Sequence, residues 1–302
     1  MIRRRTALAS AAGLLALPAR AQADWRGQFR EIRYGIISSE NERDAIARQG
    51  GLQAYAERRM AVPLRVFRGT DYAGVVEALR ASQLEFAYLG PAAYALSRRA
   101  MGERVQPLLR YRNLDGSEGY YSVVFVKADS PYRSLADLRG KSFAFADPNS
   151  ASGFAAPNYF LRREGIQPAQ HFGRTGFSGS HEQSVVAVLN GTFDAGATFW
   201  NNEASGNIQR MTQKGMIPEG ATRIIWQSPL IPSSPVVTRA ELPEGLKRDF
   251  VAMLQAMAEE APEALRQLNP HTTGFVPARH ADYADVIAMT EENQANRRDR
   301  RS

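Results

Sequence analysis

The segment of residues 142–165 limits the possible folds of this 302-residue chain more than any other. Residues 142–146 alternate in hydrophobicity as a short strand does, and residues 154–165 have a helical pattern that ends at a glycine. The linking residues 147–153 (DPNSASG) are rich in turn formers. A helix that starts directly after a strand exposes unpaired backbone N–H groups at the positive end of its dipole. Serine hydroxyls add donors, so the segment predicts either a binding site for a tetrahedral oxyanion or an ordinary helix N-cap.

Strand-like and helix-like patterns alternate along the whole chain, which indicates an α/β fold. The expected strands are residues 31–38, 64–67, 84–89, 120–127, 142–146, 172–176, 192–199, 224–226 and 236–238. The expected helices are residues 42–60, 71–81, 92–99, 131–138, 154–165, 180–190, 248–268 and 282–293. The pattern fits two α/β lobes with more than one crossing between them.

Two further polar side chains, like the serine-rich turn, lie at the start of a predicted helix. His181 follows Gly179 and Ser180 at the start of a predicted helix, where either the imidazolium or the neutral ring can donate to an anion. Tyr72 lies in the first turn of the helix after residues 64–67. Open α/β sheets bind ligands at the carboxyl ends of their strands, which makes both residues candidates for ligand contact.

Residues 1–23 have the three parts of a secretory signal. Residues 3–5 (RRR) are basic, residues 7–18 are apolar but too short to span a membrane, and residues 21–23 (AQA) form a small-residue cleavage site. We expect cleavage after Ala23 and a periplasmic location. The paired arginines within the basic run also permit twin-arginine export.

Composition and charge exclude several classes of function. The chain has no cysteine, which excludes zinc sites built from thiolates and cysteine nucleophiles. Its net charge of +7 falls to +3 without the four arginines of the signal, and no long basic stripe remains for nucleic acid. Ser150 and His181 with an aspartate allow a hydrolytic triad to be drawn, but the nucleophile elbow Gly-x-Ser-x-Gly is missing. We therefore expect no enzymatic activity, no cofactor and no metal.

Five motifs occur in a set order: residues 67–74 (FRGTDYAG), 119–123 (GYYSV), 147–153 (DPNSASG), 179–182 (GSHE) and 228–232 (SPLIP). In this order the chain resembles the phosphonate-, phosphite- and phosphate-binding proteins of ABC transporters. The resemblance implies a type II periplasmic binding-protein fold, with two Rossmann-like lobes joined by crossover strands. It implies that residues 24–119 and 230–302 form lobe 1 and that residues 120–229 form lobe 2.

The resemblance also assigns roles to individual residues. Ser150, Ser152 and the backbone N–H groups of residues 151–153 would hold phosphonate oxygens, Tyr72 would donate from the opposing lobe, and His181 would donate as well. Members that take aminoalkyl phosphonates use two acids for the ammonium group. The residues implied to contact ligand are Tyr72, Tyr120, Ser150, Ala151, Ser152, His181, Asn201 and Ser234.

Asn201 and Ser234 stand where the two acids are expected, which disfavours aminoethylphosphonate unless Glu203 takes the first place. A pocket near Trp200 and Asn201 without acids, together with neutral donors around the oxyanion, favours a small substituent. We therefore predict a monomer that captures phosphite, a short alkylphosphonate or phosphate for an inner-membrane ABC permease and its ATPase. The alternative is a periplasmic sensor that presents its ligand to a receptor kinase.

Overall fold

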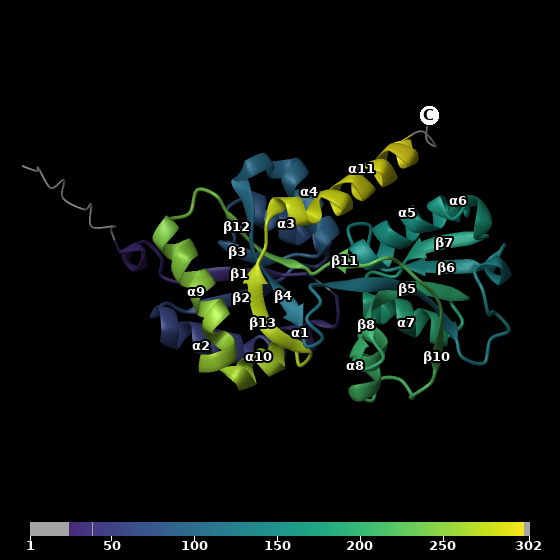
Figure 1. Ribbon diagram of the computed structural model, residues 1–302, viewed down its shortest axis with the longest axis horizontal. Helices are drawn as coiled ribbons and strands as arrows, with labels where there is room; N and C mark the ends of the chain where they lie inside the picture. The colour runs from purple at the N-terminus through teal and green to yellow at the C-terminus, as the bar shows by residue number, and fades with distance from the viewer. Residues whose placement is uncertain (1–23, 38, 299–302) are drawn as a thin grey trace, which may run out of the picture.

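Two β-sheets, each covered by helices on both faces, build the two lobes of the protein (Figure 1). The computed structural model describes residues 24–37 and 39–298, so the predicted signal and its cleavage site lie outside the described residues. The α/β class predicted from the alternating patterns is confirmed. Among the described helices, none is long and apolar enough to cross a bilayer.

Lobe 1 is built on a six-stranded sheet in the order β13-β4-β12-β3-β1-β2. Its strands are β1 (Ile32–Ile36), β2 (Leu64–Arg68), β3 (Phe86–Tyr88), β4 (Val105–Asn113), β12 (Pro235–Arg239) and β13 (Thr272–Pro277). One core cluster packs α1 (Glu42–Arg48), α2 (Gly50–Met60), α9 (Glu244–Glu260) and α10 (Pro262–Leu268) on one face. A second cluster packs α3 (Tyr72–Arg80) and α4 (Pro91–Met101) on the other. β1 pairs in parallel with β2 and β3, so the loops after these strands meet at one edge.

Lobe 2 is built on a seven-stranded sheet whose main path is β10-β5-β8-β6-β7. Its strands are β5 (Gly119–Lys127), β6 (Ser142–Phe145), β7 (Arg174–Phe177), β8 (Ala195–Asn202), β9 (Ser205–Gly206), β10 (Thr222–Gln227) and β11 (Ile231–Pro232). The helices α5 (Ala156–Arg163) and α6 (Pro168–His171) cover one face, and α7 (His181–Leu189) and α8 (Asn207–Gln213) cover the other. The buried side chains form separate apolar clusters on the two faces.

The chain connects the lobes more than once. It leaves the first sheet after β4 for β5, and β11 pairs with β5 before the chain returns to the first sheet at β12. The last helix, α11 (Ala284–Arg298), runs from lobe 1 alongside α5 of lobe 2 (Figure 1). There the Asn293 side chain donates a hydrogen bond of 2.9 Å to the Ala155 carbonyl. The residue limits of the two lobes stay a prediction.

Two long helices expected from the sequence are each divided in the structure. Residues 42–60 form α1 and α2, which are separated at Gln49 just before Gly50. Residues 248–268 belong to α9 and α10, which are separated at Ala261, where the backbone leaves the helical conformation. Pro262 explains the second break, because proline lacks an N–H group and disfavours helical backbone in the residue before it.

Several elements were not predicted, among them the strands β4 and β13 and the helices α6 and α8. Pro107 lies inside β4, and a proline within a run argues against a strand. The structure accommodates it where the pairing of β12 with β4 shifts register, between Val236 and Val237. The predicted helix over residues 131–138 was also wrong in extent, since a single short turn, Ala136–Leu138, is helical there.

Candidate ligand-binding site

A cavity of about 450 Å³ is lined by residues from both lobes. It contains every position predicted to contact ligand. These are Tyr72, Tyr120, Ser150, Ala151, Ser152, His181, Asn201 and Ser234. The fold thus brings together side chains that are far apart in the sequence, although their contact with a ligand remains a prediction.

The serine-rich turn opens a helix whose first turn is wider than an α-helical turn. Residues Ala151–Ala155 form one π turn, from which α5 continues, and Ser150 is the N-cap. Pro157 has no N–H to donate to the Gly153 carbonyl four residues earlier. That carbonyl instead accepts a hydrogen bond of 3.0 Å from the Ala146 N–H at the end of β6. The turn is thereby fixed to the sheet edge that borders the cavity.

Ser150 is the N-cap of this turn, and its hydroxyl hydrogen can still be donated to a ligand. Its Oγ accepts a hydrogen bond of 3.0 Å from the Gly153 N–H. The ordinary N-cap, which the sequence allowed as the alternative to an oxyanion site, is therefore present. The Gly153 N–H is therefore already used. Helix geometry leaves the N–H groups of Ala151 and Ser152 without intrahelical acceptors, and these two remain for an oxyanion.

Buried hydrogen bonds position the Ser152 backbone. The Ser122 hydroxyl on β5 donates to the Ser152 carbonyl at 2.7 Å. The Ser122 N–H in turn donates to the Ser228 hydroxyl at 2.9 Å. Three of the five sequence motifs therefore meet in one network, which holds the turn against the second sheet.

His181 is buried beside Ser150 and is uncharged at neutral pH. Its Nε2 lies 3.1 Å from Ser150 Oγ, and its Nδ1 lies 3.2 Å from Thr198 Oγ1. Burial lowers the pKa of His181 to about 3, and the positive charge of Arg210 acts in the same direction. Of the two protonation states considered from the sequence, the neutral ring is the one present, and it can donate one hydrogen bond.

Tyr72 faces the serine-rich turn from lobe 1. It is the first residue of α3, and the capping side chain of Asp71 accepts a hydrogen bond of 2.7 Å from the Gly74 N–H. Burial raises the pKa of the Asp147 carboxyl of lobe 2, and the Tyr72 backbone N–H acts in the opposite direction. Burial raises the pKa of the Tyr72 phenol, and Asp147 adds to the effect. Burial likewise raises the pKa of Tyr120, so both phenols are neutral donors.

The far end of the cavity differs in part from the prediction. Asn201 and Ser234 line it as expected, but Phe199 takes the place predicted for Trp200. Alternate residues of β8 point to opposite faces, and the Trp200 ring lies instead 5.8 Å from that of Tyr121. No acid was expected in the pocket near Trp200 and Asn201, whereas Glu40 is among the residues that line the cavity.

The charged lining residues that the sequence did not reveal include Glu40, Arg48, Arg210 and Lys214. Arg48 Nε donates to the Glu40 carboxylate at 3.0 Å, and Lys214 Nζ donates to it at 2.8 Å. Burial raises the pKa of Glu40, but Arg210 and Arg48 outweigh burial, so the pKa is lowered and Glu40 is ionised. No local pattern marks these residues, because α1 of lobe 1 and α8 of lobe 2 meet only in the folded protein.

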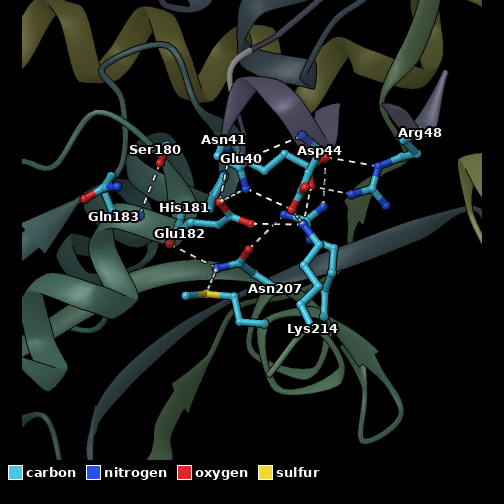
Figure 2. Close-up of polar contacts among 12 residues, drawn as sticks. Glu40, Asn41, Asp44, Arg48, Ser180, His181, Glu182, Gln183, Asn207 and Lys214 are labelled. Carbon is cyan, nitrogen blue, oxygen red and sulfur yellow. Dashed lines mark hydrogen bonds and ion pairs between the residues drawn. The ribbon is translucent and has the colours of Figure 1, made fainter. Parts of the chain in front are cut away.

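Lys214 stands between three carboxylates drawn from both lobes (Figure 2). Its Nζ lies 2.8 Å from Glu40, 2.7 Å from Asp44 and 3.3 Å from Glu182. The Glu182 carboxylate also accepts a hydrogen bond of 2.8 Å from the Asn41 N–H. The three acids have a spacing that would suit a metal ion, but the lysine ammonium already supplies the positive charge between them.

Comparison with known proteins identifies the family of the chain. The family model described as "ABC transporter, phosphonate, periplasmic substrate-binding protein" matches residues 34–283. The chain is 32% identical to the phosphonates-binding periplasmic protein of Escherichia coli over 73% of this chain and 64% of that protein's length. It is 30% identical to the phosphate-import protein PhnD of Mycolicibacterium smegmatis, over 94% of this chain and 95% of that one.

A solved structure has the same fold. PhnD1 from Prochlorococcus marinus, in complex with methylphosphonate, superposes with a TM-score of 0.76 at 21% identity, covering 88% of this chain and 98% of that one. The two lobes thus have the type II periplasmic binding-protein fold predicted from the motifs. The chain belongs to the periplasmic phosphonate-binding proteins, the substrate-binding components of ABC transporters.

Proposed function

We propose that this protein captures a small phosphorus oxyanion, namely phosphite, a short alkylphosphonate or phosphate, by closure of its lobes. One observation carries the proposal: the donors predicted for an oxyanion line a single cavity from both lobes. Ser150, the adjoining N–H groups and His181 come from lobe 2, and Tyr72 comes from lobe 1. A ligand held by both sets of donors favours closure of the lobes around it.

The donors suit an oxyanion that replaces water on entry. The Ser150 and Ser152 hydroxyls, the N–H groups of Ala151 and Ser152 and the Tyr72 phenol surround one end of the cavity. His181 adds one N–H when its Nδ1 accepts from Thr198. Hydrogen bonds to a charged acceptor are shorter and stronger than those between neutral groups, and removal of water strengthens them further.

The other end of the cavity determines the substituent. Asn201 and Ser234 provide no carboxylate for an ammonium group, and Glu40 is engaged with Arg48 and Lys214. Aminoethylphosphonate should therefore bind more weakly than phosphorus anions without an amine. The relatives named for phosphonates and for phosphate support the ligand class.

The pairing of Ser150 with His181 does not make a nucleophile and base. The second imidazole nitrogen faces the Thr198 hydroxyl, where a catalytic triad requires a carboxylate. A histidine with a pKa of about 3 is also a poor proton acceptor at neutral pH. We infer a binding protein without enzymatic activity, which acts as a monomer.

The cellular context forms part of the same proposal. Export would cleave the signal after Ala23, and the mature protein would deliver its ligand to an inner-membrane permease with an ATPase. The lobe limits would be residues 24–119 with 230–302, and residues 120–229.

Calorimetric titration with phosphate, phosphite, methylphosphonate, aminoethylphosphonate and sulfate tests the proposal. We expect at least one phosphorus anion without an amine to bind far more tightly than aminoethylphosphonate. Preferred binding of aminoethylphosphonate would overturn the proposed specificity. Absence of binding by all the phosphorus anions would overturn the proposed ligand class.

A further inference from the structure

Arg210 brings a positive charge close to the proposed oxyanion site. It lines the cavity from α8, and its guanidinium carbon lies 5.3 Å from the centre of the Phe199 ring. The same ring meets the His181 imidazole edge-on, with 5.1 Å between ring centres. Arg210 and His181 therefore both contact the Phe199 ring, and both line the same cavity.

The guanidinium of Arg210 has few polar partners for a side chain that is only 20% exposed. Its Nη2 donates to the neutral Asn207 amide oxygen at 3.0 Å. Its Nη1 lies 3.7 Å from Glu40 Oε1, beyond hydrogen-bond distance. Its Nε, shielded from solvent, has no hydrogen-bond partner in the described part of the chain. Of the five N–H donors of a guanidinium, those on Nη1 and the second one on Nη2 make no hydrogen bond within the described residues and can serve a ligand.

Glu40 compensates the charge of Arg210 only in part, because two closer cations share its carboxylate. Arg48 and Lys214 both donate hydrogen bonds to Glu40, and each approaches more closely than Arg210 does. Burial lowers the pKa of the Arg210 guanidinium, which reflects the poor solvation of this charge. An anion that entered the cavity would supply the missing partner.

The charge of the whole cavity lining points the same way. Among the described lining residues, Glu40 is the single carboxylate, whereas Arg48, Arg210, Lys214 and Arg266 are cations. Asp44 and Glu182 also neutralise Lys214, and Glu263 pairs with Arg266. Arg48 and Arg210 therefore face Glu40 with an excess of one positive charge, which attracts an anion and repels an ammonium group.

The cavity also has room beyond an oxyanion. Its volume of about 450 Å³ lies in the range of pockets that enclose small organic molecules. A phosphoryl group takes the place of only a few water molecules of roughly 30 Å³ each. A substituent can therefore extend from the serine-rich turn towards Arg210.

We propose that Arg210 binds a second anionic group of the ligand. The preferred ligands would then be phosphonates or phosphate esters whose substituent carries a carboxylate or a second phosphoryl group. The inference rests on the proposed function, in which the first phosphoryl group occupies the turn at Ser150. A guanidinium suits this role because its planar N–H groups match either anion with two parallel hydrogen bonds.

A matched pair of ligands tests the charge preference without any mutation. Phosphonoacetate and phosphonoacetamide are nearly equal in size, but only the first carries a carboxylate. We expect phosphonoacetate to bind the wild-type protein at least about tenfold more tightly in calorimetric titration, the effect of one charge-assisted hydrogen bond. Methylenediphosphonate, titrated in parallel, shows whether a second phosphoryl group is preferred to the carboxylate.

Variants then assign the preference to Arg210. In Arg210→Gln the ratio between phosphonoacetate and phosphonoacetamide should fall to about threefold or less, with methylphosphonate affinity nearly unchanged. The control is Arg80→Gln, which removes an exposed arginine that pairs with Glu77 and is not among the cavity-lining residues, and which should keep the preference. Arg210→Lys keeps the charge and provides a second test if the glutamine variant does not fold.

The outcomes separate this inference from the proposed function. Equal binding of phosphonoacetate, methylenediphosphonate and phosphonoacetamide would overturn the second-anion inference, whereas binding of methylphosphonate would still support the proposed function. A preference that persists in Arg210→Gln would overturn the role of Arg210. Failure of every phosphorus ligand to bind would overturn the proposed function itself.

Discussion

The Glu182 carboxylate accepts a hydrogen bond of 2.8 Å from the backbone N–H of Asn41, which belongs to the other lobe. Glu182 directly follows His181 in the first turn of α7, and His181 lines the cavity. One turn of helix therefore carries both a proposed ligand contact and a contact between the lobes. Ligand binding and lobe closure are expected to stabilise each other through this turn.

We expect Glu182→Gln to weaken ligand binding by about tenfold, because it removes the charge that faces Lys214 and the strong acceptor for the Asn41 N–H. These contacts join the two lobes, so a form with the lobes apart would lack them. The substitution therefore destabilises the form in which the lobes are closed around the ligand. Titration gives the affinity, and small-angle scattering gives the fraction of compact molecules. Glu77→Gln, at an exposed helix pair with Arg80, is the control, and equal affinity and scattering in both variants would contradict the coupling.

Ser150→Ala and His181→Ala should each weaken binding of the phosphorus anion by about 1.5–3 kcal/mol, because each removes a hydrogen bond to a charged ligand. Their effects should not add, since the two side chains touch. Ser134→Ala on the exposed surface serves as the control for Ser150→Ala. Unchanged affinity in both variants would place the binding site elsewhere.

Gly153→Ala should abolish tight binding and lower the melting temperature. A Cβ at this position would lie 2.5 Å from the Ala146 Cβ, 2.9 Å from Ser150 Oγ and 3.0 Å from His181 Cε1. The turn has to shift to admit it, which displaces two proposed donors at once. Gly116→Ala is the matched control for stability alone: its Cβ meets nothing within 4 Å, but its positive φ of 81° strains alanine. Wild-type affinity in Gly153→Ala would show that the turn adapts.

The free energy of unfolding should fall in acid because of His181. The folded protein binds a proton there only near pH 3, whereas the ordinary pKa of the unfolded chain is 6.5. Below pH 6.5 the His181 imidazole is protonated in the unfolded state but stays neutral in the folded state. Stability from this group is therefore complete above the ordinary pKa and is lost as pH falls towards 3, at up to about 1.4 kcal/mol per pH unit.

Denaturant unfolding of wild type and His181→Asn at several pH values measures this effect. The wild type should lose stability relative to the variant as the pH is lowered from about 7 to about 4. A constant difference across this range would mean that His181 keeps its ordinary pKa in the folded protein.

Local rules explain why parts of the site were predictable. Residues 147–153 combine turn formers, serines and a following helix, and each of these acts within a few residues along the chain. His181 and Tyr72 were found for the same reason, since both stand at the start of a helix that follows a strand. Their contact with a ligand stays a prediction, whereas their place in one cavity is a property of the fold.

The sequence by itself determined the α/β class, the turn at Ser150 and the family. Each of these is encoded by residues close together in the sequence and does not depend on long-range contacts. Only the tertiary structure decided which charges enter the cavity. Glu40 and Arg210 are 170 residues apart, and their approach to 3.7 Å depends on how two lobes pack. The face of β8 was decided in the same way, since a shift of one residue exchanges Phe199 for Trp200. Charge at the far end of the cavity is thus a property of lobe packing, which no local pattern encodes.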